Sequence, residues 1–238
     1  MPNIFTIASL VPTTAAVAEL PATAAAELLP EEEAMLGSVS DKRRRDFTLG
    51  RECARQALQK LGIAPAPILR GTAGEPLWPL SVCGSITHCD GYCAATVARQ
   101  AHIHGIGIDV ERIQTLTDDV FKRISLEPEQ AWIRDAEPQT PWDILLFSAK
   151  ESVFKAWFPA VGTWIGFEHA RIEFDPSMCS FRAIVLPDAP GADVPTVIDG
   201  RFHVDGEWVG TSAIIPAMFR RSPQVSLDNP PQAKPGAR

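Results

Sequence analysis

Two acidic residues in one segment have the types and the spacing of a site for a divalent metal ion. Asp109 and Glu111 occupy positions i and i+2 of residues 105–113, where Ile and Val alternate with them. In a β-strand that alternation places both carboxylates on one face. They repel each other unless a cation lies between them, and Mg²⁺ prefers such oxygen ligands. The alternative is a polar outer face of an edge strand, which does not explain why an apolar strand ends in a double acid. Gly105 and Gly107 would let a ligand approach this strand closely.

A third carboxylate, Glu151, lies in residues 147–158, which contain no Gly or Pro and repeat apolar residues at helical spacing. Three phenylalanines form one stripe of this predicted helix, and Glu151 lies in the middle of it. A carboxylate there is costly unless a cation or hydrogen bonds compensate it. Two explanations stay open. One is a structural ion pair with Lys155, four residues further on; the other is a buried carboxylate that holds a metal or moves a proton.

A basic segment precedes these acids in the chain. Residues 41–61 are predicted to form a helix, with Ser40 as its N-cap and Gly62 as its stop. The helix would carry a basic stripe formed by Arg44, Arg51 and Arg55, with Arg43 beside it. A solvated charged face explains such a stripe. Clustered arginines also suit a phosphate monoester, because the guanidinium fork binds it bidentately.

A predicted hairpin and a glycine-containing loop lie between the two segments. Residues 81–88 and 92–99 are interpreted as strands around a tight turn, with His88 at its mouth. Cys89 and Cys93 nearby fit no common zinc spacing. The loop at residues 70–76 is too irregular for a phosphate-binding P-loop.

The remaining pattern predicts a mixed α and β chain. We expect an early strand over residues 4–10 and a helix near 22–29, and we expect residues 31–33 to form a solvated acidic turn or a helix start. Short helices are predicted over 118–124 and 128–135. An antiparallel sheet is expected from strands over residues 164–167, 169–174, 181–186, 201–204 and 208–216. From about residue 221 the composition predicts a disordered tail.

Composition limits the class of protein. The 238 residues, 45% hydrophobic and 21% charged, suffice for one large or two small globular domains. A net charge of −7 argues against a general nucleic-acid binder. Five cysteines without disulfide spacing favour a reducing cytoplasm. A signal peptide begins with a basic region, but no Lys or Arg precedes Lys42. No apolar run is long enough to span a bilayer.

The order of these motifs resembles the 4′-phosphopantetheinyl transferases of the surfactin- and enterobactin-synthetase type, especially their actinobacterial members. Residues 107–111 look like the family's G-I-D-x-E strand, and residues 147–156 look like its W/F-x-x-K-E-A/S-x-x-K helix. Three further blocks match: residues 42–51 the R-R-x-x-F-x-x-x-R helix, 71–76 the G-x-x-G-x-P loop and 85–88 the S-x-[ST]-H turn. Five blocks in the family's order are hard to obtain by accident.

The resemblance implies an α/β (α+β) fold. Two similar α/β subdomains would be related by a pseudo-two-fold axis, with coenzyme A in the cleft between them. The division would fall near residue 115, giving an N-terminal subdomain (1–115), a C-terminal subdomain (116–220) and the tail (221–238). No internal repeat is visible in the residues themselves.

The resemblance also implies catalytic roles. Asp109, Glu111 and Glu151 would hold Mg²⁺, or Mn²⁺, against the pyrophosphate of coenzyme A. Glu151 or a metal-bound water would take the proton from a serine hydroxyl of the carrier protein. Lys155 would neutralise the pyrophosphate and protonate the leaving phosphate, and Lys150 would support the same phosphates.

Coenzyme A would be held by further residues from several blocks. Arg43 and Arg51 would bind the 3′-phosphate, with Arg44 as a possible third partner, and Thr87 and His88 would contact the other phosphates. Three more positions complete the implied binding set: Arg70, Gly71 and Ile165. The chain departs from the family at Ala73, where a Lys is common, at Val110, which cannot ligate a metal, and at Phe147, where many members have Trp.

The implied activity is the transfer of 4′-phosphopantetheine from coenzyme A to a serine of an apo acyl- or peptidyl-carrier protein, with release of 3′,5′-ADP. The enzyme would be a cytoplasmic monomer without nucleic-acid or membrane partners. Carriers of fatty-acid, polyketide and nonribosomal peptide synthesis all stay open. Two alternatives remain: a catalytically silent coenzyme A-binding module, and a Mg²⁺-dependent phosphohydrolase, which would not require the arginine helix.

Overall fold

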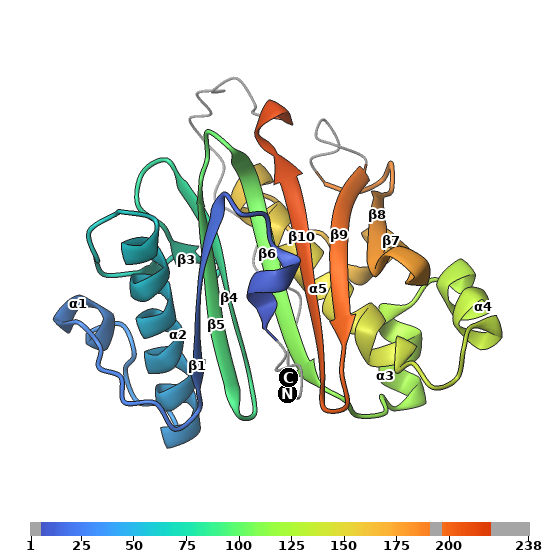
Figure 1. Ribbon diagram of the computed structural model, residues 1–238, viewed down its shortest axis with the longest axis horizontal. Helices are drawn as coiled ribbons and strands as arrows, with labels where there is room; N and C mark the ends of the chain where they lie inside the picture. The colour runs from blue at the N-terminus through green and yellow to red at the C-terminus, as the bar shows by residue number, and fades with distance from the viewer. Residues whose placement is uncertain (1–5, 191–196, 220–238) are drawn as a thin grey trace.

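The computed structural model describes residues 6–190 and 197–219 of the chain, and within them the backbone forms three antiparallel sheets (Figure 1). The first sheet has the order β1 (Ala15–Pro21), β5 (Tyr92–Arg99), β4 (Val82–Cys89). The second has the order β6 (Ile103–Arg112), β10 (Trp208–Pro216), β9 (Val197–Val204), β8 (Ser180–Val185), β7 (Ala170–Asp175). The third pairs β2 (Leu69–Arg70) with β3 (Pro76–Leu77). This mixture confirms the predicted α+β class.

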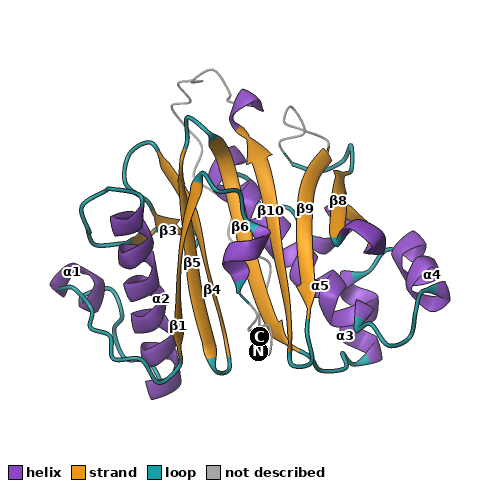
Figure 2. Cartoon of the chain, viewed as in Figure 1, coloured by secondary structure: helices purple, strands orange, loops and turns teal. Residues whose placement is uncertain are grey.

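Five helices and four short 3₁₀ segments accompany these sheets in the described residues. The helices are α1 (Pro30–Glu33), α2 (Asp41–Lys60), α3 (Asp118–Ile124), α4 (Glu127–Asp135) and α5 (Trp142–Val161). The 3₁₀ segments are η1 (Ile7–Leu10), η2 (Phe167–His169), η3 (Pro176–Met178) and η4 (Ala217–Phe219). Figure 2 shows α2 against the first sheet at one end of the molecule and α3 and α4 grouped at the other. Within the part of the chain that is described, no helix has the length and apolarity to cross a membrane.

Helix α2 forms as predicted and covers the first sheet. The Ser40 side chain accepts a hydrogen bond from the Arg43 backbone N–H, and Gly62 stops the helix with a positive φ of 74°. Its inner face is fully buried at Ala54 and Leu58. Small residues on β5 let α2 lie close to that sheet, so the position of its arginines is fixed by packing.

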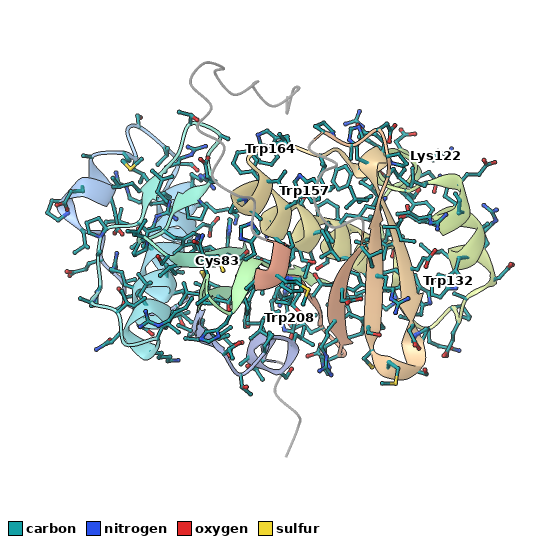
Figure 3. The ribbon with its side chains drawn as sticks, turned by 90° about the horizontal axis from the view of Figure 1, so that it is seen from above. Cys83, Lys122, Trp132, Trp157, Trp164 and Trp208 are labelled. Atoms are coloured by element: carbon teal, nitrogen blue, oxygen red, sulfur yellow. The ribbon has the colours of Figure 1, made fainter. Side chains whose placement is uncertain are left out.

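Helix α5 crosses the second sheet and begins five residues earlier than predicted, at Trp142. It ends at Gly162, which has a φ of 79°. Trp157 is fully buried in the largest hydrophobic cluster, between the helix and the sheet. Figure 3 shows Trp157 on α5 inside the molecule and Trp132 on α4 at its far end.

The glycines of β6 are explained by this helix. A Cβ atom at Gly107 would clash with the backbone carbonyl oxygen of Ser152, and one at Gly105 with that of Ala156. Both glycines therefore let α5 lie directly on the strand. The expectation that they make room for a ligand is wrong, because the helix fills that space.

The two large sheets meet at a seam between β4 and β6. The Ser85 hydroxyl oxygen accepts a hydrogen bond of 3.1 Å from the Ile108 backbone N–H. The Thr87 hydroxyl oxygen accepts one of 3.1 Å from the Val110 N–H. Side chains thus replace the backbone ladder where the strands run side by side (Figure 1). Because β6 also pairs with β10, the predicted first subdomain contributes an edge strand to the second sheet. The boundary near residue 115 and the pseudo-two-fold axis stay predictions.

A buried glutamate braces each of the two long helices. Glu32 is fully buried and accepts hydrogen bonds from the Leu29 backbone N–H at 3.0 Å, from the Ile68 N–H at 2.9 Å and from the Arg55 guanidinium. The prediction of a helix start at residues 31–33 is confirmed, but a solvated turn is wrong at Glu32. A buried carboxylate needs such partners, and here it joins α1, α2 and the segment before β2.

The second brace has the same construction. Glu129 is 4% exposed and accepts from the Leu126 backbone N–H at 2.6 Å, the Ile172 N–H at 2.7 Å and the Lys150 ammonium at 2.8 Å. In each brace the glutamate follows a Leu by three residues near a helix start that contains Pro. We call these two networks the Glu32 brace and the Glu129 brace.

The structure contradicts several predicted elements. Residues 7–10 form η1 instead of a strand, while residues 1–5 lie outside the described residues. Residues 22–29 form no helix, because the chain leaves β1 in a turn and then runs without regular structure to Pro30. Strand β1 itself was not predicted. Residues 164–166 form no strand and lead into η2. The predicted disordered tail lies outside the described residues.

The other predicted strands and helices are confirmed. The hairpin of β4 and β5, the strand β6, the helices α3 and α4, and the antiparallel strands β7 to β10 all form, with β9 beginning four residues earlier than expected. Their patterns are local: alternating apolar residues in strands, and capped apolar repeats in helices.

Candidate functional site

Asp109 lies where β6, the seam and α5 meet. It is 3% exposed, and its Oδ1 accepts hydrogen bonds from the Lys155 Nζ at 2.6 Å and from the Thr87 hydroxyl at 3.3 Å. The same Nζ donates to the Ile108 carbonyl oxygen at 3.2 Å. The second oxygen, Oδ2, is buried without a hydrogen-bond partner. A buried carboxylate oxygen in that condition is suited to an incoming cation or donor.

Two half-buried glutamates complete an acidic cluster around Asp109. The pKa of Glu111 is raised to about 7, chiefly by burial and also by the nearby Asp109 and Glu151, while Lys155 lowers it. Burial alone would lower the pKa of Lys155, but Asp109, Glu151 and Glu111 raise it above its ordinary value. Three carboxylates therefore share one ammonium. We call Asp109, Glu111, Glu151 and Lys155 the acidic cluster.

The acidic cluster fits a hard divalent cation in its chemistry. Its ligands are carboxylate oxygens, one of them unpartnered, and burial together with the neighbouring carboxylates raises the pKa of Glu111. No three metal-binding side chains already converge on one point among the described residues. The Lys155 ammonium pairs with one oxygen of Asp109.

A basic cluster lies at the other side of the seam, on α2 and β2. Arg51 is 6% exposed, its guanidinium carbon lies 4.2 Å from the centre of the Phe47 ring, and its Nε has no hydrogen-bond partner. The pKa of Arg51 is lowered to about 10, chiefly by burial and also by the charges of Arg70 and Arg43, while Glu32 raises it. A buried guanidinium with cationic neighbours and an unused N–H favours an anion. Arg43, Arg51 and Arg70 form the basic cluster.

His88 lies between the two clusters. Burial lowers the pKa of His88, the carboxylate of Asp46 raises it, and the charges of Lys155 and Arg43 lower it. Its Nε2 lies 3.6 Å from the Asp46 Oδ2. One cation of each cluster, Lys155 and Arg43, is therefore close enough to act on the imidazole. Asp46 was not singled out in the sequence, although its place four residues after Lys42 allows the ion pair that the structure shows at 3.1 Å.

Two residues of the predicted binding set, Lys150 and Thr87, have partners within the protein. Lys150 is fully buried, and its Nζ donates to Glu129 and, at 2.9 Å, to the Phe167 carbonyl oxygen. The Thr87 hydroxyl is occupied by Val110 and Asp109 at the seam, with the side chain 1% exposed. The roles of Lys150 and Thr87 toward the phosphates stay predictions.

Ile165 is 5% exposed and packs in the largest hydrophobic cluster, so its side chain presents no surface to a ligand. Gly71 lies beside Arg70, and a Cβ there would clash with the carboxylate of Glu75. Its role is to let the loop between β2 and β3 close on Glu75. Gly71 thus has a structural role within the loop, and its role in binding coenzyme A stays a prediction.

The predicted basic stripe of α2 divides in two. Arg55 is part of the Glu32 brace and also donates to Glu52 at 2.7 Å. Arg44 donates to Glu33 at 2.5 Å on the surface. Neither has a buried nitrogen without a hydrogen-bond partner, as Arg51 has. The signal for the braces was present in the sequence, as Glu three residues after a Leu that precedes a Pro-containing helix start, but it does not reveal which cation is the partner.

The cysteines take no part in either cluster. All five are free thiols, and burial raises the pKa of Cys89 to about 12, which keeps it protonated. Cys93 is buried at 1% exposure.

Comparisons with known proteins cover most of the chain. The family model described as the 4′-phosphopantetheinyl transferase N-terminal domain matches residues 31–98, and that of the 4′-phosphopantetheinyl transferase superfamily matches residues 105–192. The chain is 39% identical over 218 residues to the 4′-phosphopantetheinyl transferase Svp of Streptomyces mobaraensis, covering 88% of this chain and 86% of that protein.

Two further relatives carry the same printed activity. The chain is 40% identical over 194 residues to the 4′-phosphopantetheinyl transferase PptT of Mycobacterium tuberculosis, covering 79% of this chain and 86% of the relative. It is 47% identical over 146 residues to the 4′-phosphopantetheinyl transferase Npt of Nocardia iowensis, covering 61% of this chain and 66% of the relative. The two family models meet between residues 98 and 105, just before β6 at the seam.

Proposed function

This chain belongs to the 4′-phosphopantetheinyl transferase superfamily, and from that premise we propose that it transfers the phosphopantetheine group of coenzyme A to a serine of an apo acyl- or peptidyl-carrier protein, releasing 3′,5′-ADP. The observation that carries the proposal is a pair of buried polar atoms without hydrogen-bond partners, the Asp109 Oδ2 in the acidic cluster and the Arg51 Nε in the basic cluster. Coenzyme A is the substrate of the family, and its ribose carries a 3′-phosphate and a 5′-pyrophosphate. Such a ligand requires a cationic site and a separate site for its pyrophosphate.

The basic cluster would bind the 3′-phosphate of coenzyme A. Arg51 offers an Nε–H without a partner, and its stack on Phe47 fixes the plane of the guanidinium. Arg43 and Arg70 are the nearby cations whose charge lowers the pKa of Arg51. An anion there would relieve their mutual repulsion, so the site is electrostatically prepared for a phosphate. His88 would contact the phosphates between this site and the acidic cluster.

Asp109, Glu111 and Glu151 would hold a divalent ion, Mg²⁺ or Mn²⁺. Such an ion, when bound, neutralises charge on the pyrophosphate and on the 5′-phosphate that leaves with 3′,5′-ADP. The unpartnered Asp109 Oδ2 supports this assignment. The three acids come from β6 and α5, which Gly105 and Gly107 hold in contact. The metal preference stays open.

The transfer needs a proton acceptor and a cation near the leaving group. The serine hydroxyl oxygen of the carrier would bond to the β-phosphorus, the bond from that phosphorus to the bridging oxygen would break, and 3′,5′-ADP would leave. Glu151 would accept the hydroxyl proton, because it is a half-buried carboxylate in the acidic cluster. Lys155, one turn further along α5, would neutralise the leaving phosphate.

The test is a transfer assay with three outcomes. The protein is mixed with coenzyme A, Mg²⁺ and several apo carrier proteins, and intact-mass spectrometry follows the carriers. We expect a gain of one phosphopantetheine on a carrier serine. Coenzyme A binding without a gain on any carrier would favour a silent binding module, and release of free phosphopantetheine without a carrier would favour a phosphohydrolase. The expected cytoplasmic location and monomeric state stay predictions.

A further inference from the structure

The Lys155 ammonium occupies a place that a divalent ion on Asp109 would contest. Its Nζ lies 2.6 Å from the Asp109 Oδ1 and 3.2 Å from the Ile108 carbonyl oxygen. The other carboxylate oxygen, Oδ2, is buried and unpartnered. An ion that binds Asp109 therefore arrives beside a fixed positive charge. Two positive charges on the same carboxylate repel each other strongly in a partly buried site.

Lys155 has room to leave this position without unfolding the helix. Its side chain keeps 29% exposure, whereas that of Asp109 keeps only 4%. A lysine has a flexible four-carbon stem and carries its charge as a compact point, so the ammonium can move while the backbone of α5 stays fixed. Asp109 cannot follow it, because β6 lies under α5 and its Oδ1 is also held by Thr87.

The direction of that movement is set by the charges around the site. The charge of Lys155 reaches His88, which also feels the Arg43 cation of the basic cluster. A phosphate ligand lying along that path would offer anionic oxygens to the ammonium. The lysine would then exchange one anionic partner, Asp109, for another. The carboxylate on that side, Asp46, already pairs with Lys42 at 3.1 Å and faces the His88 imidazole.

We infer that Lys155 couples the binding of the divalent ion to the binding of the phosphate ligand, because it competes with the ion for Asp109 until a phosphate oxygen accepts its ammonium. The inference rests on the proposed function for the identity of the ligand. It goes beyond that function by assigning Lys155 a role in the order of assembly. Coupling of this kind is reciprocal, so the ion strengthens coenzyme A binding by the same factor.

Calorimetric titration of Mn²⁺, used as the probe ion, tests this inference without any turnover. Wild type and Lys155→Met are titrated with Mn²⁺ alone and again with saturating coenzyme A. We expect Lys155→Met to bind Mn²⁺ alone roughly 5- to 150-fold more tightly than wild type, the range of typical coupling factors. Coenzyme A should tighten Mn²⁺ binding less in the variant than in wild type, although the pyrophosphate oxygens themselves still favour the ion.

The matched control is Lys42→Met. Lys42 is a cation whose charge also reaches His88, but it pairs with Asp46 and does not contact Asp109. If the loss of any nearby positive charge were enough, Lys42→Met would gain as much Mn²⁺ affinity as Lys155→Met, and the inference would be overturned. It would also be overturned if Lys155→Met bound Mn²⁺ no more tightly than wild type. If circular dichroism shows Lys155→Met to be unfolded, Lys155→Gln, which keeps a polar head, is used in its place.

Asp109→Asn separates this inference from the proposed function. If wild type and Asp109→Asn bind Mn²⁺ equally, the acidic cluster is no metal site, and both ideas fail. If Mn²⁺ binding is lost in Asp109→Asn but unchanged in Lys155→Met, the metal site stands and only the competition by Lys155 is refuted. Loss in the first variant together with a gain in the second supports both.

Discussion

Helices α2 and α5 each carry one cation that is fully paired with a buried glutamate and one that belongs to the candidate site. Arg55 on α2 and Lys150 on α5 are enclosed, because a buried glutamate of a brace pairs with each of them. Arg51 on α2 has an Nε without a partner, and Lys155 on α5 lies on an aspartate whose other oxygen has none. The chemical types are the same within each helix, while the degree of compensation differs.

This difference shows how the molecule separates support from function. A buried charge with all its hydrogen bonds made holds elements together and has nothing left to offer a ligand. A buried charge with an unused donor or acceptor costs stability, and such a cost is retained where a ligand compensates it. The braces and the two clusters are therefore predicted to respond to mutation in opposite ways.

Breaking a brace should produce the largest effect. Lys150→Met leaves Glu129 buried without its cation, and removal of one partner of a buried ion pair typically costs about 3–5 kcal/mol of unfolding free energy. Urea denaturation followed by circular dichroism measures the loss. Lys122→Met on the exposed surface of α3 is the control and should change stability by less than about 0.5 kcal/mol. Equal stability of both variants would contradict the supporting role of the Glu129 brace.

Glu151→Gln should lower activity and leave stability nearly unchanged. The substitution keeps the size of the side chain and removes one of three carboxylates that share Lys155. We expect phosphopantetheine transfer to fall about 10²- to 10³-fold, which corresponds to about 2.7–4 kcal/mol. The unfolding free energy should change little. A stable fold with near wild-type transfer, or a loss of several degrees in melting temperature with activity retained, would return Glu151 to the structural ion pair with Lys155.

Arg51→Gln sharpens the comparison on α2. Hydrogen bonds to charged groups contribute about 1.5–3 kcal/mol, so the dissociation constant of coenzyme A should rise about 10- to 100-fold. Because Arg51 lies beside other cations, its removal should not destabilise the fold as Lys150→Met does. Calorimetry with coenzyme A and with 3′-dephospho-coenzyme A measures the difference. If the variant and wild type bind both ligands alike, the basic cluster does not bind the 3′-phosphate.

Arg44→Gln should give the smallest effect. Arg44 pairs with Glu33 on the surface, where the side chains are 44% and 50% exposed, and such pairs contribute about 0–1 kcal/mol. Coenzyme A affinity should stay within a factor of about two. The small loss of stability should vanish in high salt, which screens exposed charges. A tenfold loss of coenzyme A affinity would instead make Arg44 a member of the basic cluster, as the family resemblance allows.

The elements that the sequence predicts well are those with a strong local pattern. Strand β6 and helices α2 and α5 follow from alternation, capping and helical repeats. Strand β1 was missed because Ala15–Pro21 is rich in alanine, which is depleted in strands, and only pairing with β5 makes it a strand. The helix expected near residues 22–29 failed for the opposite reason, since helix propensity is weak without a face to pack.

The candidate site divides in the same way. The sequence identified Asp109, Glu111, Glu151 and Lys155, because their spacing within β6 and α5 is unusual for solvated charges. That the three acids hold a metal ion and that Lys155 acts on the phosphates stay predictions. The sequence could not separate Lys150 from Lys155, or Arg55 from Arg51, since all four are cations on predicted helices.

The sequence by itself determined the family, the mixed fold class and the charged segments from which the site is built. Only the tertiary structure decided which charges are compensated. The physical reason is sequence separation: Lys150 and Glu129 are 21 residues apart, Arg55 and Glu32 are 23 apart, and Lys155 and Asp109 are 46 apart. Helical or strand spacing reveals neighbours within one element, whereas the partner of a buried charge is set by the packing of different elements.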